Sequence, residues 1–193
     1  LASMTREQFM FYEMKITAQL LADGFTVDEI VERVIDENLF QYPTEKSCKR
    51  MAVGCIRRLG FLSKELVKVL ATASTDEARQ ICLYALMKQN RLVLEFMVNV
   101  IGEKYRTQNL HFTKLDINEF FASLQEQNDV VASWSEATIK KLKSVLIKLL
   151  VDNEYLENTK AEDLKPVWLY PALENSIRED CDEKVLSAFN CFD

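Results

Sequence analysis

Glycine, proline and histidine are scarce in this 193-residue chain, which contains four glycines, three prolines and one histidine. Between the few glycines and prolines lie long windows of Leu, Lys, Glu and Ala at helical spacing, and these favour a mainly helical fold. Hydrophobic residues make up 48% and charged residues 28%, as in folded globular proteins and unlike disordered ones. We therefore predict an all-α chain with a substantial core.

Long hydrophobic runs are also missing. No apolar stretch approaches the roughly 20 residues that cross a bilayer. The most apolar window, Leu92 to Ile101, is interrupted by Glu95 and Asn99. The first residues do not form a basic region followed by an apolar signal core. These absences predict a cytoplasmic protein that does not bind membranes.

Patterns that carry catalysis or metal binding are equally absent. The five cysteines form no C-x-x-C pair, and His111 is the one histidine that could complete a metal site or a nucleophile–base pair. The four glycines are isolated from one another, so neither common phosphate-binding loop is present. We expect no catalytic residue, no metal and no cofactor, and we predict that the chain is not an enzyme.

Two cation-rich stretches, 46–59 and 137–151, contain no carboxylate in a chain whose net charge is −6. The pattern predicts a helix over 44–59 and another over 136–151. Each has apolar residues at i, i+3, i+4 and i+7, and its basic side chains project from the opposite face. Such cationic faces neutralise the phosphates of duplex DNA and release counterions. The sequence therefore predicts two surfaces that bind double-stranded DNA.

The candidate DNA contacts on the first basic helix are Lys46, Lys49, Arg50, Arg57 and Arg58. Those on the second basic helix are Thr138, Lys140, Lys141, Lys143, Ser144 and Lys148, where the two hydroxyl groups add phosphate hydrogen bonds. Gly54 is expected on the outward arc of the first helix, where it would permit close approach to the DNA backbone. Lysine mostly contacts phosphate, so we expect weak sequence discrimination.

Capping signals divide the first half of the chain. A first helix is predicted over 5–22, and Thr26 with Glu29 forms a capping box that opens the next helix. Three further helices are predicted between residues 61 and 106, capped by Ser63, by Thr75 or Asp76, and by Asn90. Residues 1–108 are thus expected to form an N-terminal helical region with a helix-turn-helix-like unit over 26–60.

The second half, residues 109–193, is predicted to form a winged-helix-like region with an acidic tail. Asp116 with Glu119 and Ser133 with Glu136 are read as capping boxes for two helices, the second of which is basic. Two short apolar segments joined by a polar tip predict a β-hairpin wing near residues 155–170. One or two short helices are expected in the tail, 173–193.

The order of several segments resembles that of a known family. They are Asn90-Arg91-Leu92, Glu95-Phe96, Tyr105-Arg106, Trp134-Ser135-Glu136-Ala137-Thr138, Lys141-Leu142, 153–159 and Pro166-Val167. Taken together they resemble BrxA, a family of small core components of bacteriophage exclusion (BREX) defence systems. The similarity extends from about Thr5 to Ile177 and includes no catalytic signature.

The resemblance implies a bacterial cytoplasmic protein that acts beside a DNA methyltransferase, a large ATPase and a phosphatase-like protein. Such a system methylates host DNA and blocks phage replication. Members have been labelled inner-membrane proteins, which the span length of this sequence contradicts. They have also been compared with a small helical antitermination factor that binds RNA.

Two alternatives to DNA binding remain open from the sequence. The chain could be a scaffold that docks other defence components through its middle helices and acidic tail. It could also bind RNA.

Overall fold

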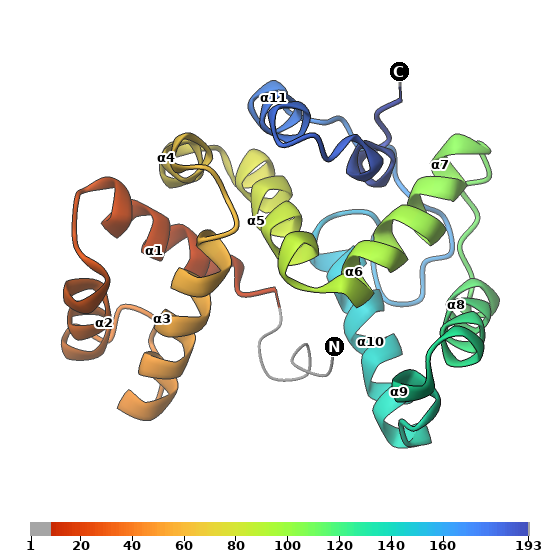
Figure 1. The fold of residues 1–193 in the computed structure, drawn as a ribbon, viewed down its shortest axis with the longest axis horizontal. Helices are drawn as coiled ribbons and strands as arrows, with labels where there is room; N and C mark the ends of the chain where they lie inside the picture. Colours follow the sequence, from red (N-terminus) through yellow and green to blue (C-terminus); the bar gives the residue numbers. More distant parts are fainter. Residues whose placement is uncertain (1–8, 193) are drawn as a thin grey trace. The chain divides into compact units, whose positions relative to one another are not determined.

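The computed structural model describes residues 9–192, and this range is predominantly helical (Figure 1). One isolated β-bridge, between His111 and Asp163, is the sole strand-like pairing in the described range. The predicted all-α fold is confirmed. None of the helices between residues 9 and 192 combines the length and the hydrophobicity that a bilayer-spanning segment needs.

The described chain divides into two compact units. One contains Phe9–Gln89 together with Tyr170–Ser176, and the other contains Asn90–Leu169 together with the C-terminal segment from Ile177. The division falls at Gln89 and Asn90, upstream of the boundary expected near residue 108. Residues 97–106 belong to the second unit because they pack against the C-terminal segment.

Five helices of the described residues lie wholly within the first unit. They are α1 (Phe11–Ala22), α2 (Val27–Asp36), α3 (Glu45–Leu59), α4 (Lys64–Thr72) and α5 (Thr75–Gln89). Helix α1 packs against α3 and α4, while α2 packs on α3 and α5 contacts α1, α3 and α4 (Figure 1). The first helix was predicted from Thr5, but residues 5–8 lie outside the described range.

Local capping explains where these helices begin. The Thr26 side chain accepts from the Glu29 backbone while the Glu29 carboxylate accepts from Thr26, so the predicted capping box is confirmed. The Thr26 backbone hydrogen bond also lowers the pKa of Glu29. Ser63 caps α4 as predicted. Helix α5 is capped by Ser74, one residue before the expected Thr75 or Asp76.

Arg58 is the largest buried polar side chain of the first unit, with 1% of its surface exposed. Its guanidinium donates to the backbone oxygen of Phe9 at 2.8 Å and to Oε1 of Gln89 at 2.8 Å. Arg58 was expected to reach a phosphate, but its charge lies inside the protein. It therefore ties α3 to the start of α1 and the end of α5.

The second unit opens with one continuous helical segment, whose first cap, Asn90, is as predicted. It comprises α6 (Arg91–Phe96), a π-helical stretch η2 (Met97–Gly102) and α7 (Glu103–Arg106). Gly102 packs so closely on the C-terminal segment that a Cβ there would lie 2.5 Å from Ser187 Oγ. The wide π-helical turn ends at this close approach, which excludes any larger residue.

Helices α8 (Lys114–Gln127), α9 (Asp129–Ala132) and α10 (Glu136–Asp152) follow. Helix α8 begins earlier than predicted, because Thr113 is the cap and Asp116 is its capping-box partner. Helix α10 is capped by Ser135, whereas Ser133 ends α9. The capping boxes predicted at Asp116–Glu119 and Ser133–Glu136 were therefore wrong in position. The first cap is Thr113, three residues before Asp116, and the second is Ser135, two residues after Ser133.

The β-hairpin wing predicted near residues 155–170 is not formed. The Lys165 backbone donates to the Tyr155 backbone oxygen, but the segment over 162–165 bonds mainly to residues 110–112. Leu164 donates to Leu110 at 2.8 Å, and Phe112 donates to Glu162 at 2.6 Å. Pro166 has no N–H with which to extend a hairpin ladder.

The C-terminal segment, for which one or two short helices were expected, forms two. They are α11 (Pro171–Glu179), which begins in the first unit, and the 3₁₀ helix η3 (Glu183–Phe189). Helix η3 packs on η2 and α7. The Tyr155 hydroxyl donates to the backbone oxygen of Ala188 at 2.9 Å, and burial raises the pKa of Tyr155. The tail is therefore part of the core.

We expect Arg58→Met to lower the free energy of unfolding by about 3 kcal/mol, because each buried acceptor left unpaired costs roughly 1–3 kcal/mol. Arg57→Met is the matched control, since Arg57 is exposed and surface ionic interactions contribute at most about 1 kcal/mol. Urea unfolding followed by circular dichroism measures both. Equal stability of the two variants would contradict a structural role for Arg58.

A second prediction concerns pH. Lys104 Nζ lies 2.6 Å from the Asp116 carboxylate. Partial burial alone would raise the pKa of Asp116, but hydrogen bonds from Lys104 and Thr113 outweigh it and lower the pKa. A carboxyl group with a lowered folded-state pKa stabilises the fold above its unfolded pKa of about 3.9, and this contribution is lost as pH falls through the folded value.

Lys104→Met should therefore destabilise the protein at pH 7 by on the order of 1 kcal/mol. The difference from wild type should narrow as pH falls below about 4, the range of an unperturbed Asp pKa. Arg106→Met is the control, because its ion pair with Glu103 is exposed. Unfolding curves measured between pH 3 and 7 test this, and a difference that does not depend on pH would count against it.

Candidate nucleic-acid interface

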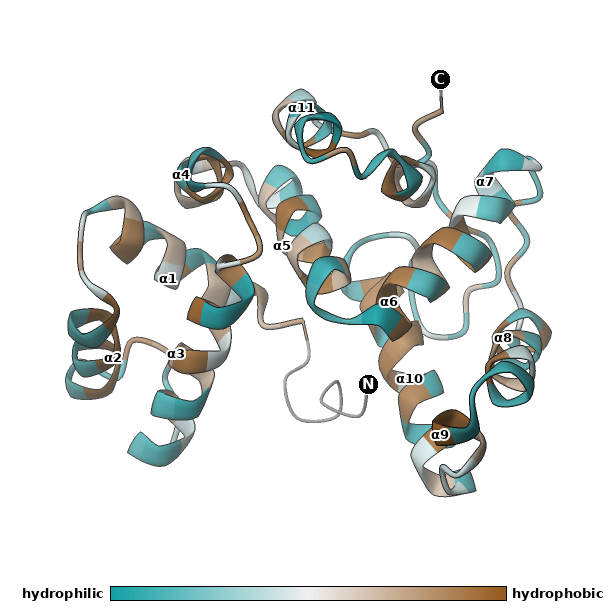
Figure 2. Cartoon of the chain, in the orientation of Figure 1, coloured by the Kyte–Doolittle hydropathy of each residue, from teal (hydrophilic) through white to brown (hydrophobic). Residues whose placement is uncertain are grey.

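Helix α3 presents its cations on the face opposite its buried stripe. The Thr44 side chain caps the helix by accepting from the Ser47 backbone. The buried residues are Cys48, Met51, Ala52, Gly54, Cys55, Arg58 and Leu59. Lys46, Lys49, Arg50 and Arg57 are exposed. Four of the five cations predicted on this helix thus reach solvent, and its first turns are hydrophilic (Figure 2).

Gly54 and Arg58 share the reason for their inward position. Gly54 is three residues and Arg58 seven residues after the buried Met51, so all three lie on the same face of the helix, at the edge of the apolar stripe. Gly54 is buried and does not lie on the outward arc as predicted. Val53, with 47% of its surface exposed, lies among the cations instead.

The connection between α2 and α3 is anchored by polar contacts. Asn38 Oδ1 accepts from the Tyr42 backbone at 3.0 Å and from Cys48 Sγ at 3.2 Å. The Tyr42 hydroxyl donates to Glu13 of α1 at 2.6 Å, and burial followed by this bond raises the pKa of Tyr42. These contacts hold the start of α3 in place. They fix how its cationic face is presented.

Helix α10 is oriented by its leucines. Leu142, Leu146, Leu149 and Leu150 are buried, which leaves Lys140, Lys141 and Lys148 exposed. Lys143 is half-buried and lies on the side that faces α8. Its Nζ donates to Asn118 Oδ1 at 2.7 Å and lies 5.5 Å from the centre of the Phe121 ring. The predicted lysines therefore divide between an outward face and a face turned toward α8.

The two hydroxyl groups predicted to bind phosphate are engaged within the helix. Thr138 Oγ1 lies 2.9 Å from the Oγ of Ser135, the capping residue. Ser144 donates to the backbone oxygen of Lys140 at 3.1 Å. Both contacts are exposed and local, so either hydroxyl group would have to rearrange to reach a phosphate.

Six of the predicted cations have no carboxylate within ion-pair distance in residues 9–192. They are Lys46, Lys49, Arg50, Lys140, Lys141 and Lys148. Arg57 is exposed but has further interactions inside the chain. The acidic side chains that give the chain its net negative charge thus leave these six ammonium and guanidinium groups uncompensated. Such groups are suited to contact an external anion.

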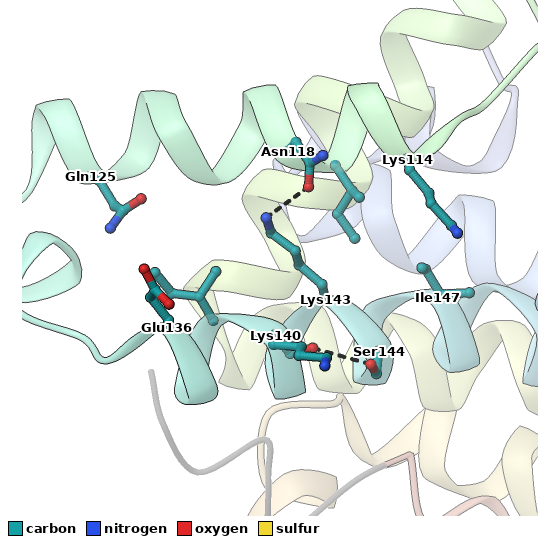
Figure 3. Close-up of a pocket in the computed structure, with 10 residues that line it drawn as sticks. Lys114, Asn118, Gln125, Glu136, Lys140, Lys143, Ser144 and Ile147 are labelled. Carbon is teal, nitrogen blue, oxygen red and sulfur yellow. Dashed lines mark hydrogen bonds between the residues drawn. The ribbon is translucent and has the colours of Figure 1, made fainter.

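Lys114 is a cation near this surface that the sequence pattern did not indicate. It lies in the first turn of α8 and, with Lys140 and Lys143, lines a groove of about 720 Å³ between α8 and α10 (Figure 3). The helix start expected at Asp116 placed Lys114 outside the helix. The capping signal of Thr113 with Asp116 three residues later could have located it.

A metal site is not evident in the described residues. No group of three His, Cys, Asp or Glu side chains in this range could hold a metal ion. His111 is exposed, with Nδ1 3.4 Å from Asp163 and Nε2 4.0 Å from Glu162. Cys48, Cys55 and Cys82 are buried, and burial raises the pKa of Cys82, which disfavours the reactive thiolate.

Comparison with known proteins shows which family this chain is similar to. A family model described as BrxA matches residues 1–180. A Bacillus cereus (strain H3081.97) protein named BREX protein BrxA is 38% identical over 151 residues, which cover 78% of this chain and 76% of that protein. An Escherichia coli O9:H4 (strain HS) protein of the same name is 27% identical over 162 residues, covering 84% and 76% respectively.

The fold is also found in a solved structure. The crystal structure of an uncharacterized protein from Magnetospirillum magneticum matches with a TM-score of 0.81 at 22% identity, covering 98% of this chain and 97% of that one. A match at this identity shows the shared fold alone. The family model matches residues 1–180 of the 193. The Bacillus relative is 38% identical over more than two thirds of each chain. The chain belongs to the BrxA family.

Proposed function

We propose that this chain is a non-enzymatic double-stranded DNA-binding protein of a bacterial phage-defence system and acts in the cytoplasm. The observation that carries the proposal is the set of exposed cations on α3 and α10 that have no carboxylate partner within the described residues. The defence context is supported by relatives that carry the name BREX protein BrxA.

The spacing of the cations suits a phosphate backbone. Lys141 and Lys148 lie two turns apart on α10, about 10 Å along the axis at 1.5 Å per residue. Lys46 and Arg50 lie about 6 Å apart along α3 by the same rule. Duplex DNA carries one charge per about 1.7 Å of its axis, so several phosphates lie within reach of each helix. Each contact releases condensed counterions.

The net charge of −6 does not prevent this binding. At physiological salt the Debye length is about 8 Å, so carboxylates farther from the contact are largely screened. What the DNA meets at short range is the cationic face of each helix. Long-range repulsion between the acidic chain and DNA slows their association. The affinity for DNA then depends mainly on the local contacts with these cations.

Phosphate contacts should dominate over base readout. Lysines make up the exposed cations of α10, and lysine acts as a point charge without the planar fork that reads guanine. Arg50 and Arg57 are the side chains best suited to contact base edges. The helix-turn-helix geometry predicted for α2–α3 and for α8–α10 is part of this proposal. We expect weak sequence discrimination by this chain alone.

Replacing Lys140, Lys141 and Lys148 with Glu should weaken binding to a 20-bp duplex at least tenfold. The slope of log K against log salt should also become shallower by about 0.9 for each phosphate that is no longer neutralised. Mobility-shift titrations at several salt concentrations measure both quantities. Exposed substitutions usually change stability by less than about 0.5 kcal/mol, so the fold should survive.

The matched control carries the same charge change at three exposed positions outside α3 and α10: Lys64→Glu, Lys68→Glu and Lys160→Glu. This control should keep its salt slope. Equal decreases in affinity for the two triple variants would show that net charge, not the α10 face, governs binding. If the α10 variant binds the duplex as tightly as wild type, α10 does not contact DNA.

The α3 face is tested separately with Lys46→Glu, Lys49→Glu and Arg50→Glu. We expect duplex affinity to fall at least tenfold with a shallower salt slope, because these cations contact phosphates as those of α10 do. An RNA hairpin of equal length serves as the competitor. Tighter binding of the hairpin than of the duplex would favour the RNA-binding alternative, and no binding of either would favour the scaffold.

A further inference from the structure

The groove between α8 and α10 has a feature that DNA binding leaves unexplained. Its floor is apolar, because Ile117 is buried beneath it and Ile139 and Ile147 are half-exposed along it. Hydrated phosphates gain nothing from contact with aliphatic side chains. Aliphatic groups in a concave surface instead favour a ligand that buries apolar atoms.

The rim of the groove is cationic. Lys114, Lys140 and Lys143 line it, against the single carboxylate of Glu136. Figure 3 shows Lys114 pointing from α8 toward Ile147, while Glu136 lies at the opposite end near Gln125. The charge is therefore positive at the Lys114 end and in the middle. An occupant that matches this rim carries carboxylates.

Lys143 is already held in position within the groove. Its Nζ donates to Asn118 Oδ1 at 2.7 Å (Figure 3). The same Nζ lies 5.5 Å from the centre of the Phe121 ring. A cation restrained in this way loses less side-chain entropy on binding than a free surface lysine. The ammonium group keeps two further N–H donors. It is thus prepared to donate to a carboxylate oxygen without leaving Asn118.

The dimensions fit a short peptide. Lys114 to Gln125 on α8 and Glu136 to Ile147 on α10 are each eleven residues apart, about 16 Å of helix. The two helices run antiparallel along the groove (Figure 3). That length accommodates about three turns of a docked helix or about five residues of extended chain. The volume of about 720 Å³ is within the range of specific ligand sites.

We propose that the α8–α10 groove docks an acidic segment of a partner protein that also carries aliphatic side chains. The aliphatic side chains pack on Ile139 and Ile147, which are partly exposed along the groove. Aspartate or glutamate residues of the segment pair with Lys114 and Lys143, and Lys140 supplies a further cation at the rim. The site is separate from Lys141 and Lys148 on the outward face of α10, so one helix serves two ligands.

The test is selection of a random 12-residue peptide display library on the immobilised full chain. Enriched peptides should carry net negative charge together with Leu, Ile or Val. Synthetic copies should bind Lys114→Glu/Lys143→Glu at least tenfold more weakly than wild type. They should bind Lys141→Glu/Lys148→Glu, a matched change on the outward face, within about twofold of wild type, because screening limits the effect of distant charges.

Three results would overturn the proposal. The enriched peptides could lack acidic residues, they could bind the two double variants equally, or a 20-bp duplex could lose as much affinity in the groove variant as in the outward variant. The last result would assign the groove to nucleic acid. If circular dichroism shows that Lys114→Glu/Lys143→Glu does not fold, Lys114→Glu/Ile147→Ser replaces it, with the same expected loss of peptide binding.

Discussion

The burial of one apolar stripe on each basic helix is the constraint on which the proposed DNA-binding surface depends. Fully burying a leucine contributes about 1.5–3 kcal/mol, so turning α10 to hide its lysines would expose four leucines at a cost of several kcal/mol. The stripe thus fixes the rotation of the helix about its axis. Once the rotation is fixed, the direction of every lysine on the helix follows.

Tertiary packing gives cations that look alike in sequence different physical roles. Arg57 is exposed on α3, whereas the adjacent Arg58 is buried and bonded to Phe9 and Gln89. On α10, Lys141 faces outward and Lys143 crosses toward Asn118. A count of basic residues therefore overstates the charge that a polyanion would meet. The arrangement also separates the outward lysines of α10 from a groove with an apolar floor.

The acidic character of the chain and its cationic helices are compatible because many carboxylates act locally. Glu29 and Asp116 complete capping boxes, and Glu37, Glu95 and Glu103 pair with arginines on their own helices. These carboxylates stabilise helix starts and exposed faces. They are not placed to neutralise the outward lysines of α10. Function can thus reside in a local field that opposes the sign of the whole molecule.

The sequence by itself determined the helical class, the approximate bounds of α3 and α10, and the exposure of most of their cations. Periodicity and capping are local properties, so they can be read within a few turns of chain. Arg58 and Gly54 lie at the edge of a stripe, and only contact with neighbouring elements decides whether such an edge is buried. The missing wing and the α8–α10 groove, with Lys114 on its rim, have the same origin. Each depends on contacts between segments that are distant in the sequence. The segment over 162–165 bonds to residues 110–112, and the groove is lined by side chains from two separate helices. Such contacts form only when the chain has folded, so local sequence patterns do not reveal them.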